Sequence, residues 1–162
     1  MARIFIPLES APRETRVAAT PETVKKFINL GCSLFIQKGS GYLAGFADDD
    51  YKNVGAELIE KDDLKIFSEI DTVLCVKKPN DDLLSKLVEG TLLVGLLAPY
   101  GNKSLANKLK SGHLSALALE LLPRISRAQS SDALSSQANI SGYKAILLAA
   151  SALDRYFPML MT

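Results

Sequence analysis

Residues 71–97 read DTVLCVKKPNDDLLSKLVEGTLLVGLL, and this stretch decides the fold. Its two almost wholly apolar runs, Asp71–Val76 and Thr91–Leu97, are typical of strands that are buried on both faces. Between them lie the turn signal Pro79-Asn80 and the amphipathic segment Asp81–Leu87, which is the pattern of a helix. Two strands that are joined by a helical crossover pair in parallel, so the stretch predicts an α/β fold.

The same alternation extends to both sides of this stretch. Further strands are predicted at Arg3–Pro7, Ser33–Gln37, Ala56–Ile59 and His113–Leu119. Helical segments are predicted at Pro21–Leu30, Tyr51–Val54, Lys61–Phe67, Lys103–Lys110 and, as a long helix, Ile140–Phe157. We therefore expect a Rossmann- or flavodoxin-like parallel sheet with helices on both faces, followed by a long C-terminal helix.

The length and composition fit one lobe rather than several domains. The chain has 162 residues, and 48% of them are hydrophobic, which is enough to fill the core of one domain. We expect the core to span residues 1–137 and the C-terminal helix to span about 138–157.

Charge and cysteine usage exclude several classes of function. The net charge is +1 and no run of five like charges occurs, which argues against a nucleic-acid partner and against a polybasic membrane patch. The apolar stretch Ala145–Leu153 is too short for a membrane span, and Pro7 interrupts any signal-peptide core. Cys32 and Cys75 have no further metal ligands at suitable spacing, so we predict no metal site and interpret both as small buried hydrophobes in a reducing compartment.

Three local motifs favour structural roles. The glycines of residues 39–45 lack the spacing of a dinucleotide fingerprint and indicate a turn. The acidic run Asp48–Asp50 suits a helix N-terminus better than a cation site. His113 is the single histidine and precedes a predicted strand, so general acid–base work by its ring is a weak hypothesis.

Two basic residues follow different predicted strands. Arg16 comes after the first strand, and Lys77 stands at the end of Asp71–Val76. The ends of parallel strands meet at one edge of a sheet, so the two cations are candidates for binding a small carboxylate there. Solvated surface charge is the alternative interpretation.

The richest candidate site is the polar segment 121–137. Arg124, Gln129, Asp132 and Ser135 offer a guanidinium, a carboxamide, a carboxylate and a hydroxyl within a dozen residues. Loops that follow the strands of an α/β sheet carry binding sites. Helix capping is the alternative for Asp132, but it explains neither Arg124 nor Gln129.

The sequence PRISRAQSSDALSSQANISGY at 123–143 resembles the signature of a known family. It is similar to the NAD(H)-binding component, the alpha subunit, of proton-translocating nicotinamide nucleotide transhydrogenase. The segments Arg13–Pro21 and Val76–Pro79 resemble the wider superfamily that includes alanine dehydrogenase. The resemblance covers essentially the whole chain as an N-terminal lobe and implies a second lobe, with a dinucleotide fingerprint, that this chain lacks.

The resemblance implies both a site and an activity. Arg124, Gln129, Asp132 and Ser135 would line the nicotinamide site, where they would serve both catalysis and cofactor binding. The complete subunit would bind NAD(H), a partner component would bind NADP(H), and no metal would take part. The enzyme would be a Re/Si-specific transhydrogenase that couples hydride transfer from NADH to NADP⁺ to proton translocation.

The resemblance also implies partners and a location. Partners would be the remaining Rossmann lobe, the membrane components and the NADP(H)-binding component, and a homodimer is expected. The protein would be cytoplasmic and peripheral to the inner membrane, with no segment inserted in it. The isolated chain is expected to be inactive.

Two alternatives stay open at this point. In alanine dehydrogenases the positions that match Arg16 and Lys77 hold the substrate carboxylate, and a histidine after the next strand is the acid/base. Here that strand is followed by Ala98-Pro99-Tyr100 without a histidine, which favours the transhydrogenase over an amino-acid dehydrogenase fragment. The apolar end Tyr156–Met161 leaves a non-catalytic assembly module as the third interpretation.

Overall fold

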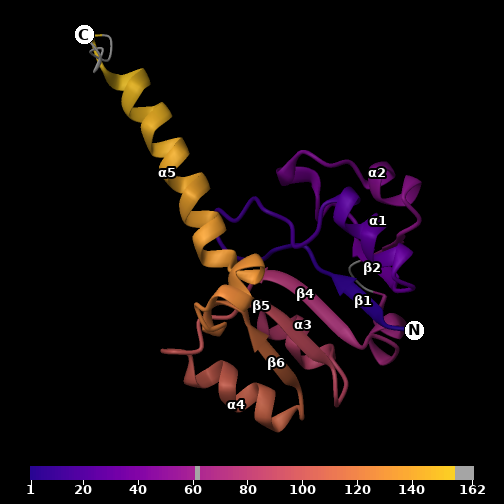
Figure 1. Cartoon of the computed structure of the whole chain (residues 1–162). Helices are drawn as coiled ribbons and strands as arrows, with labels where there is room; N and C mark the ends of the chain where they lie inside the picture. The colour runs from indigo at the N-terminus through magenta and orange to yellow at the C-terminus, as the bar shows by residue number, and fades with distance from the viewer. Residues whose placement is uncertain (61–62, 156–162) are drawn as a thin grey trace. The chain divides into compact units, whose positions relative to one another are not determined.

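The computed structural model describes residues 1–60 and 63–155, and these contain a six-stranded parallel sheet (Figure 1). The strands are β1 (Arg3–Ile6), β2 (Ser33–Gln37), β3 (Glu57–Ile59), β4 (Thr72–Lys77), β5 (Leu92–Leu96) and β6 (Ser115–Ala118). Across the sheet their order is β3-β2-β1-β4-β5-β6. This is the order of a doubly wound Rossmann sheet, so the predicted α/β fold is confirmed.

Helices and short 3₁₀ turns connect the strands. The helices are α1 (Pro21–Asn29), α2 (Asp48–Asn53), α3 (Asp81–Lys86), α4 (Lys103–Ser111) and α5 (Ala133–Ala152). The 3₁₀ turns are η1 (Tyr42–Ala44), η2 (Leu64–Ser68), η3 (Leu119–Leu121) and η4 (Ser126–Ser131). Side-chain oxygens of Thr20, Asn80 and Asn102 accept backbone N–H groups at the starts of α1, α3 and α4, which fixes where these helices begin.

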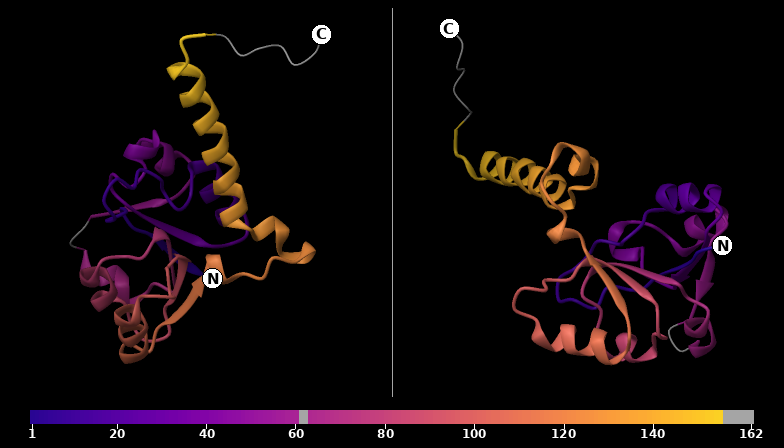
Figure 2. Two further views of the ribbon diagram at one scale, coloured as in Figure 1. Left: turned by 90° about the vertical axis from the view of Figure 1, so that its left-hand side faces the viewer. Right: turned by 60° about the horizontal axis from the view of Figure 1, so that its bottom comes forward.

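Helices cover both faces of the sheet. Phe5 of β1 belongs to a hydrophobic cluster with Leu84 of α3, whereas Ile6 belongs to a second cluster with Val24 of α1 and Tyr51 of α2. Successive residues of a strand point to opposite faces, so these clusters are the two cores of a sheet between helical layers. The views agree: α1 and α2 lie on one side of the sheet, and α3 and α4 lie on the other (Figures 1 and 2).

By its contacts the chain forms two compact units, Met1–Ala118 and Leu119–Thr162. The first holds the sheet and helices α1 to α4. Over the residues that the structure describes, the second holds η3, η4 and α5.

Helix α5 is exposed along its length and carries large apolar side chains. Ile140, Tyr143 and Ile146 are 61%, 69% and 64% exposed, and no described residue of the helix is buried. Among the described residues no helix has the length and hydropathy that a bilayer span requires.

Two element boundaries differ from the sequence-based prediction. The long helix begins at Ala133, not near residue 138 or 140, because Asp132 caps it within the polar segment where no apolar spacing signals a helix. It ends at Ala152, and the last predicted positions, 156–157, lie outside the described residues. The segment predicted as a helix over 61–67 forms the 3₁₀ turn η2 where it is described, and residues 61–62 lie outside.

Candidate functional site

The predicted residues of the polar segment line one hollow. Arg124, Gln129, Asp132 and Ser135 surround a space of about 330 Å³, together with Ile125, Ser126 and Ala128. Turn η4 and the first turn of α5 bring them together, because the chain reverses between Arg124 and Ser135. The hollow lies wholly within the unit that begins at Leu119.

Asp132 anchors this hollow to the helix. Its Oδ1 accepts the backbone N–H of Ser135 at 2.9 Å, and its Oδ2 accepts the Ser135 hydroxyl at 2.6 Å. These hydrogen bonds, with the nearby Arg124 guanidinium, lower the pKa of Asp132. Asp132 is therefore a carboxylate at neutral pH, and the capping alternative is correct as far as the geometry goes.

The other two side chains of the hollow stay exposed. Arg124 and Gln129 are exposed at the surface of η4 and the residues before it. They offer guanidinium and carboxamide donors next to one carboxylate. This set suits a ligand that carries a carbonyl or a carboxamide, and a partial positive charge on the ligand would favour the Asp132 side.

A second polar cluster lies where β1 and β4 end. The Glu14 side chain is only 4% exposed, and its Oε1 accepts the Arg16 Nε at 2.7 Å. Glu14 Oε2 lies 2.7 Å from an Arg16 terminal nitrogen and 3.3 Å from Lys77 Nζ. A buried carboxylate thus joins the two cations that the sequence predicted to meet, while Arg13 is exposed and Lys78 pairs with Asp81.

Glu9 completes this cluster from the loop after β1. Its carboxylate accepts the backbone N–H groups of Val76 at 2.5 Å and of Lys77 at 3.1 Å. Burial raises the pKa of Glu9, against these hydrogen bonds, and the negative charge of Glu14 adds to the rise. The Arg16 hydrogen bond lowers the pKa of Glu14 to about 2, and Glu14 in turn raises the pKa of Arg16.

This low pKa makes an acid-dependent prediction for Glu14. A folded-state pKa of about 2 against an ordinary 4.5 stabilises the fold fully above pH 4.5, and this contribution is lost as the pH falls towards 2. Glu14→Gln should lower the free energy of unfolding at pH 7 by roughly 1–3 kcal/mol, because buried donors lose a charged acceptor. Urea unfolding across pH 2–7 measures the difference, which should shrink as the pH falls.

The exposed pair Glu22–Lys26 supplies the control. Glu22→Gln should change stability little, because both side chains of that pair are at least 70% exposed. If wild type and Glu14→Gln lose stability in parallel down to pH 2, the role given to Glu14 is wrong.

The sequence did not reveal Glu9 and Glu14 as members of the cluster. Their only signal was position, since both lie in the loop after the first predicted strand beside Arg16. The bonds that matter span 67 and 68 residues, from Glu9 to the end of β4.

The remaining motifs have local partners. Asp48 accepts the Gly39 N–H at 2.9 Å, and Asp50 accepts the Ala47 N–H at 2.8 Å at the start of α2. His113 precedes β6, at the amino-terminal edge of the sheet, opposite the edge where Lys77 ends β4. Within residues 1–60 and 63–155 no group of three or more histidine, cysteine or acidic side chains could hold a metal ion.

Comparison with known proteins gives a consistent result. The family described as "Alanine dehydrogenase/PNT, N-terminal domain" matches residues 5–141. In Rhodospirillum rubrum, the first of the chains that make up NAD(P) transhydrogenase subunit alpha is 39% identical over 99% of this chain and 43% of its own length. An alanine dehydrogenase of Halomonas elongata is 30% identical over 74% of this chain and 32% of its own length.

A solved structure agrees with these sequence matches. The crystal structure of transhydrogenase from Sinorhizobium meliloti superposes with a TM-score of 0.88 at 38% identity, over 99% of this chain and 45% of that one. The chain spans less than half the length of these transhydrogenase relatives.

Proposed function

Because the chain belongs to the family of alanine dehydrogenase/PNT N-terminal domains, we propose that it is the N-terminal portion of the NAD(H)-binding component of a Re/Si-specific, proton-translocating transhydrogenase. The observation that carries the proposal is the convergence of Arg124, Gln129, Asp132 and Ser135 on one hollow. The transhydrogenase similarity also spans 99% of the chain, against 74% for the alanine dehydrogenase.

The hollow fits the nicotinamide end of NAD(H). Its volume of about 330 Å³ suits one ring with its carboxamide but not a whole dinucleotide. Arg124 and Gln129 donate to the carboxamide oxygen, and the Asp132 carboxylate favours the positively charged oxidised ring. The Ser135 hydroxyl, whose proton goes to Asp132, is left to accept from the carboxamide nitrogen.

When bound, the nicotinamide supplies the hydride, so the protein has to position the ring rather than move protons. Asp132 holds Ser135 and caps α5, which keeps this wall of the hollow in place. Gln129, exposed at the rim, faces the NADP(H) of the partner component. No histidine is required for this step.

The rest of the proposal concerns what completes the enzyme. A second Rossmann lobe holds most of the dinucleotide, so the isolated chain binds NAD(H) weakly and is inactive. Separate membrane components translocate the proton, and a partner component carries NADP(H). The complete subunit is a homodimer, cytoplasmic and peripheral to the inner membrane.

Alanine dehydrogenase-like activity is the second candidate, favoured by one observation. Arg16 and Lys77 meet at the Glu14 carboxylate, at the edge of the sheet where a small carboxylate substrate would bind. The chain after β5 reads Ala98-Pro99-Tyr100 and offers no histidine as a proton relay. Pyruvate- and ammonia-dependent NADH oxidation by a completed protein would favour this candidate.

A chimera tests the proposed function. We expect this chain, when it replaces the matching segment of the Rhodospirillum rubrum subunit, to support hydride transfer between NADH and an NADP⁺ analogue in the presence of the NADP(H)-binding component. The rate is measured by absorbance, and circular dichroism checks that the chimera is folded. A folded chimera without transfer would contradict the proposal.

A further inference from the structure

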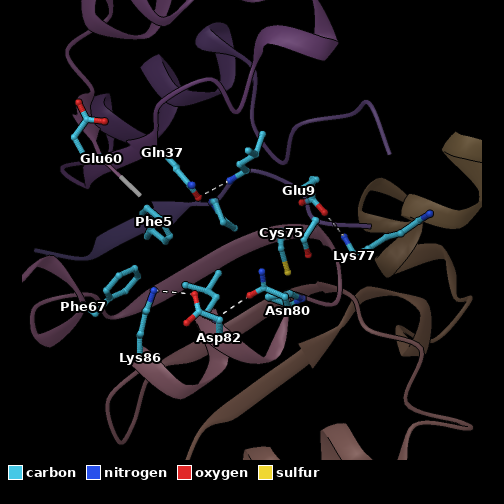
Figure 3. A pocket seen from close by; sticks show the side chains of 15 residues that line it. Phe5, Glu9, Gln37, Glu60, Phe67, Cys75, Lys77, Asn80, Asp82 and Lys86 are labelled. Carbon is cyan, nitrogen blue, oxygen red and sulfur yellow. Dashed lines mark hydrogen bonds and ion pairs between the residues drawn. The ribbon is translucent and has the colours of Figure 1, made fainter. Parts of the chain in front are cut away.

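A separate pocket lies at the carboxyl edge of the sheet, within the unit Met1–Ala118 (Figure 3). Its volume is about 190 Å³. Strand order reverses between β1 and β4, and crevices at this switch point are where open α/β sheets bind ligands. It shares no lining residue with the hollow around Arg124.

The floor of this pocket is apolar. The rings of Phe5 and Phe67 meet edge to face with centroids 5.3 Å apart, and Leu83 of α3 lines the pocket beside them. Burial raises the pKa of the Cys75 thiol to about 12, so it stays protonated, and it donates to the Val94 carbonyl at 3.4 Å. A planar ring can therefore rest on this floor without losing hydrogen bonds.

Two carboxamides at the pocket are held so that they can only donate to a ligand. Gln37 Oε1 accepts the Leu8 N–H at 2.9 Å, and Asn80 Oδ1 accepts the Leu83 N–H at 2.9 Å (Figure 3). Among the described residues neither amide nitrogen has a hydrogen-bond partner. Each oxygen is fixed by the backbone, so the NH₂ group is the end that remains for a ligand.

The charges around the pocket are paired with one another. Lys86 contacts Asp82 at 2.8 Å, Lys77 contacts Glu14 at 3.3 Å, and Lys38 pairs with Glu60. Glu9 accepts two backbone N–H groups of β4. A charged ligand would lose hydration without gaining a free counter-charge, so this lining favours a neutral one.

We propose that this pocket binds a neutral, single-ring heterocycle that carries a carbonyl or carboxamide oxygen, with that oxygen accepting from Gln37 and Asn80. A cavity of about 150 Å³ is known to hold one benzene ring, so about 190 Å³ holds one substituted ring and excludes a dinucleotide. The two NH₂ groups set the orientation of the ring, and the phenylalanine floor supplies its contact area.

Nicotinamide and nicotinate form a matched pair of probes, because they differ only in carboxamide against carboxylate. In ¹H–¹⁵N NMR titrations of the chain, nicotinamide should shift the side-chain NH₂ signals of Gln37 and Asn80 and the amide of Leu83, with a Kd on the order of 1 mM. Nicotinate should bind at least about tenfold more weakly. Equal or tighter binding of nicotinate would overturn the proposal, and so would shifts confined to residues 124–135.

Two near-isosteric variants test the donors. Gln37→Glu and Asn80→Asp keep the oxygen that holds the Leu8 or Leu83 N–H, so the fold and the α3 cap are retained, but each removes an NH₂ group. Each should weaken nicotinamide binding about tenfold or more. Asn107→Asp makes the same change on an exposed residue of α4 and should leave the Kd unchanged. Wild-type affinity in both pocket variants would overturn the proposal.

Discussion

Replacing Gln129 by alanine is expected to slow hydride transfer by about 100-fold or more in the chimeric transhydrogenase. The step depends on how the ring is placed, and a displacement of about 1 Å in such a site costs a factor of this size. Gln129 is exposed and makes no contact that the fold depends on, so the melting temperature should stay close to wild type. Stopped-flow absorbance measures the transfer rate, and calorimetry measures the melting temperature.

Asp132 permits a sharper version of the same experiment. Asp132→Asn keeps an N-cap for α5 but removes the charge, whereas Asp132→Ala removes both. We expect both variants to transfer hydride slowly and only Asp132→Ala to lose helicity at α5. Arg127→Ala, on the same turn but outside the lining of the hollow, is the matched control. Wild-type rates in Gln129→Ala and Asp132→Asn would exclude the hollow as the nicotinamide site.

The fold was predictable because its strands are buried on both faces. Asp71–Val76 and Thr91–Leu97 admit no amphipathic alternative, and the turn at Pro79-Asn80 leaves room for one helix between them. The start of α5 was not predictable in the same way. Its first turns, Ala133–Gln137, are mostly small and polar, so the only local signal was a possible cap at Asp132.

The two candidate sites differ in how far the sequence reveals them. The hollow is built from residues within one short segment, so a local pattern points to it. The cluster around Glu14 and the carboxamides Gln37 and Asn80 depend on where separate strands end. Which side chain a carboxylate reaches across the sheet is decided by register and burial, and these cannot be read from spacing along the chain.

Gly95 shows the same limit, because nothing in its sequence context explains a glycine in a buried strand. A Cβ built on Gly95 would lie 2.4 Å from the Cys75 carbonyl oxygen and 2.8 Å from its Sγ. The nearest atom belongs to the backbone of β4, which pairs with β5, so the clash cannot be relieved by a side-chain rotation. Strands β4 and β5 therefore pack closely only with glycine here.

Gly95→Ala is accordingly expected to lower the free energy of unfolding by about 3 kcal/mol or more and the melting temperature by roughly 6–12 °C. The same substitution at Gly142, on an exposed face of α5 with nothing within 4 Å, should be neutral or slightly stabilising. Cys75→Ala should not rescue Gly95→Ala, because it removes the sulfur but leaves the carbonyl oxygen in place. A Gly95→Ala protein as stable as wild type would show that β4 and β5 can separate at little cost, and the Cys75 wall of the pocket would then not be fixed by this contact.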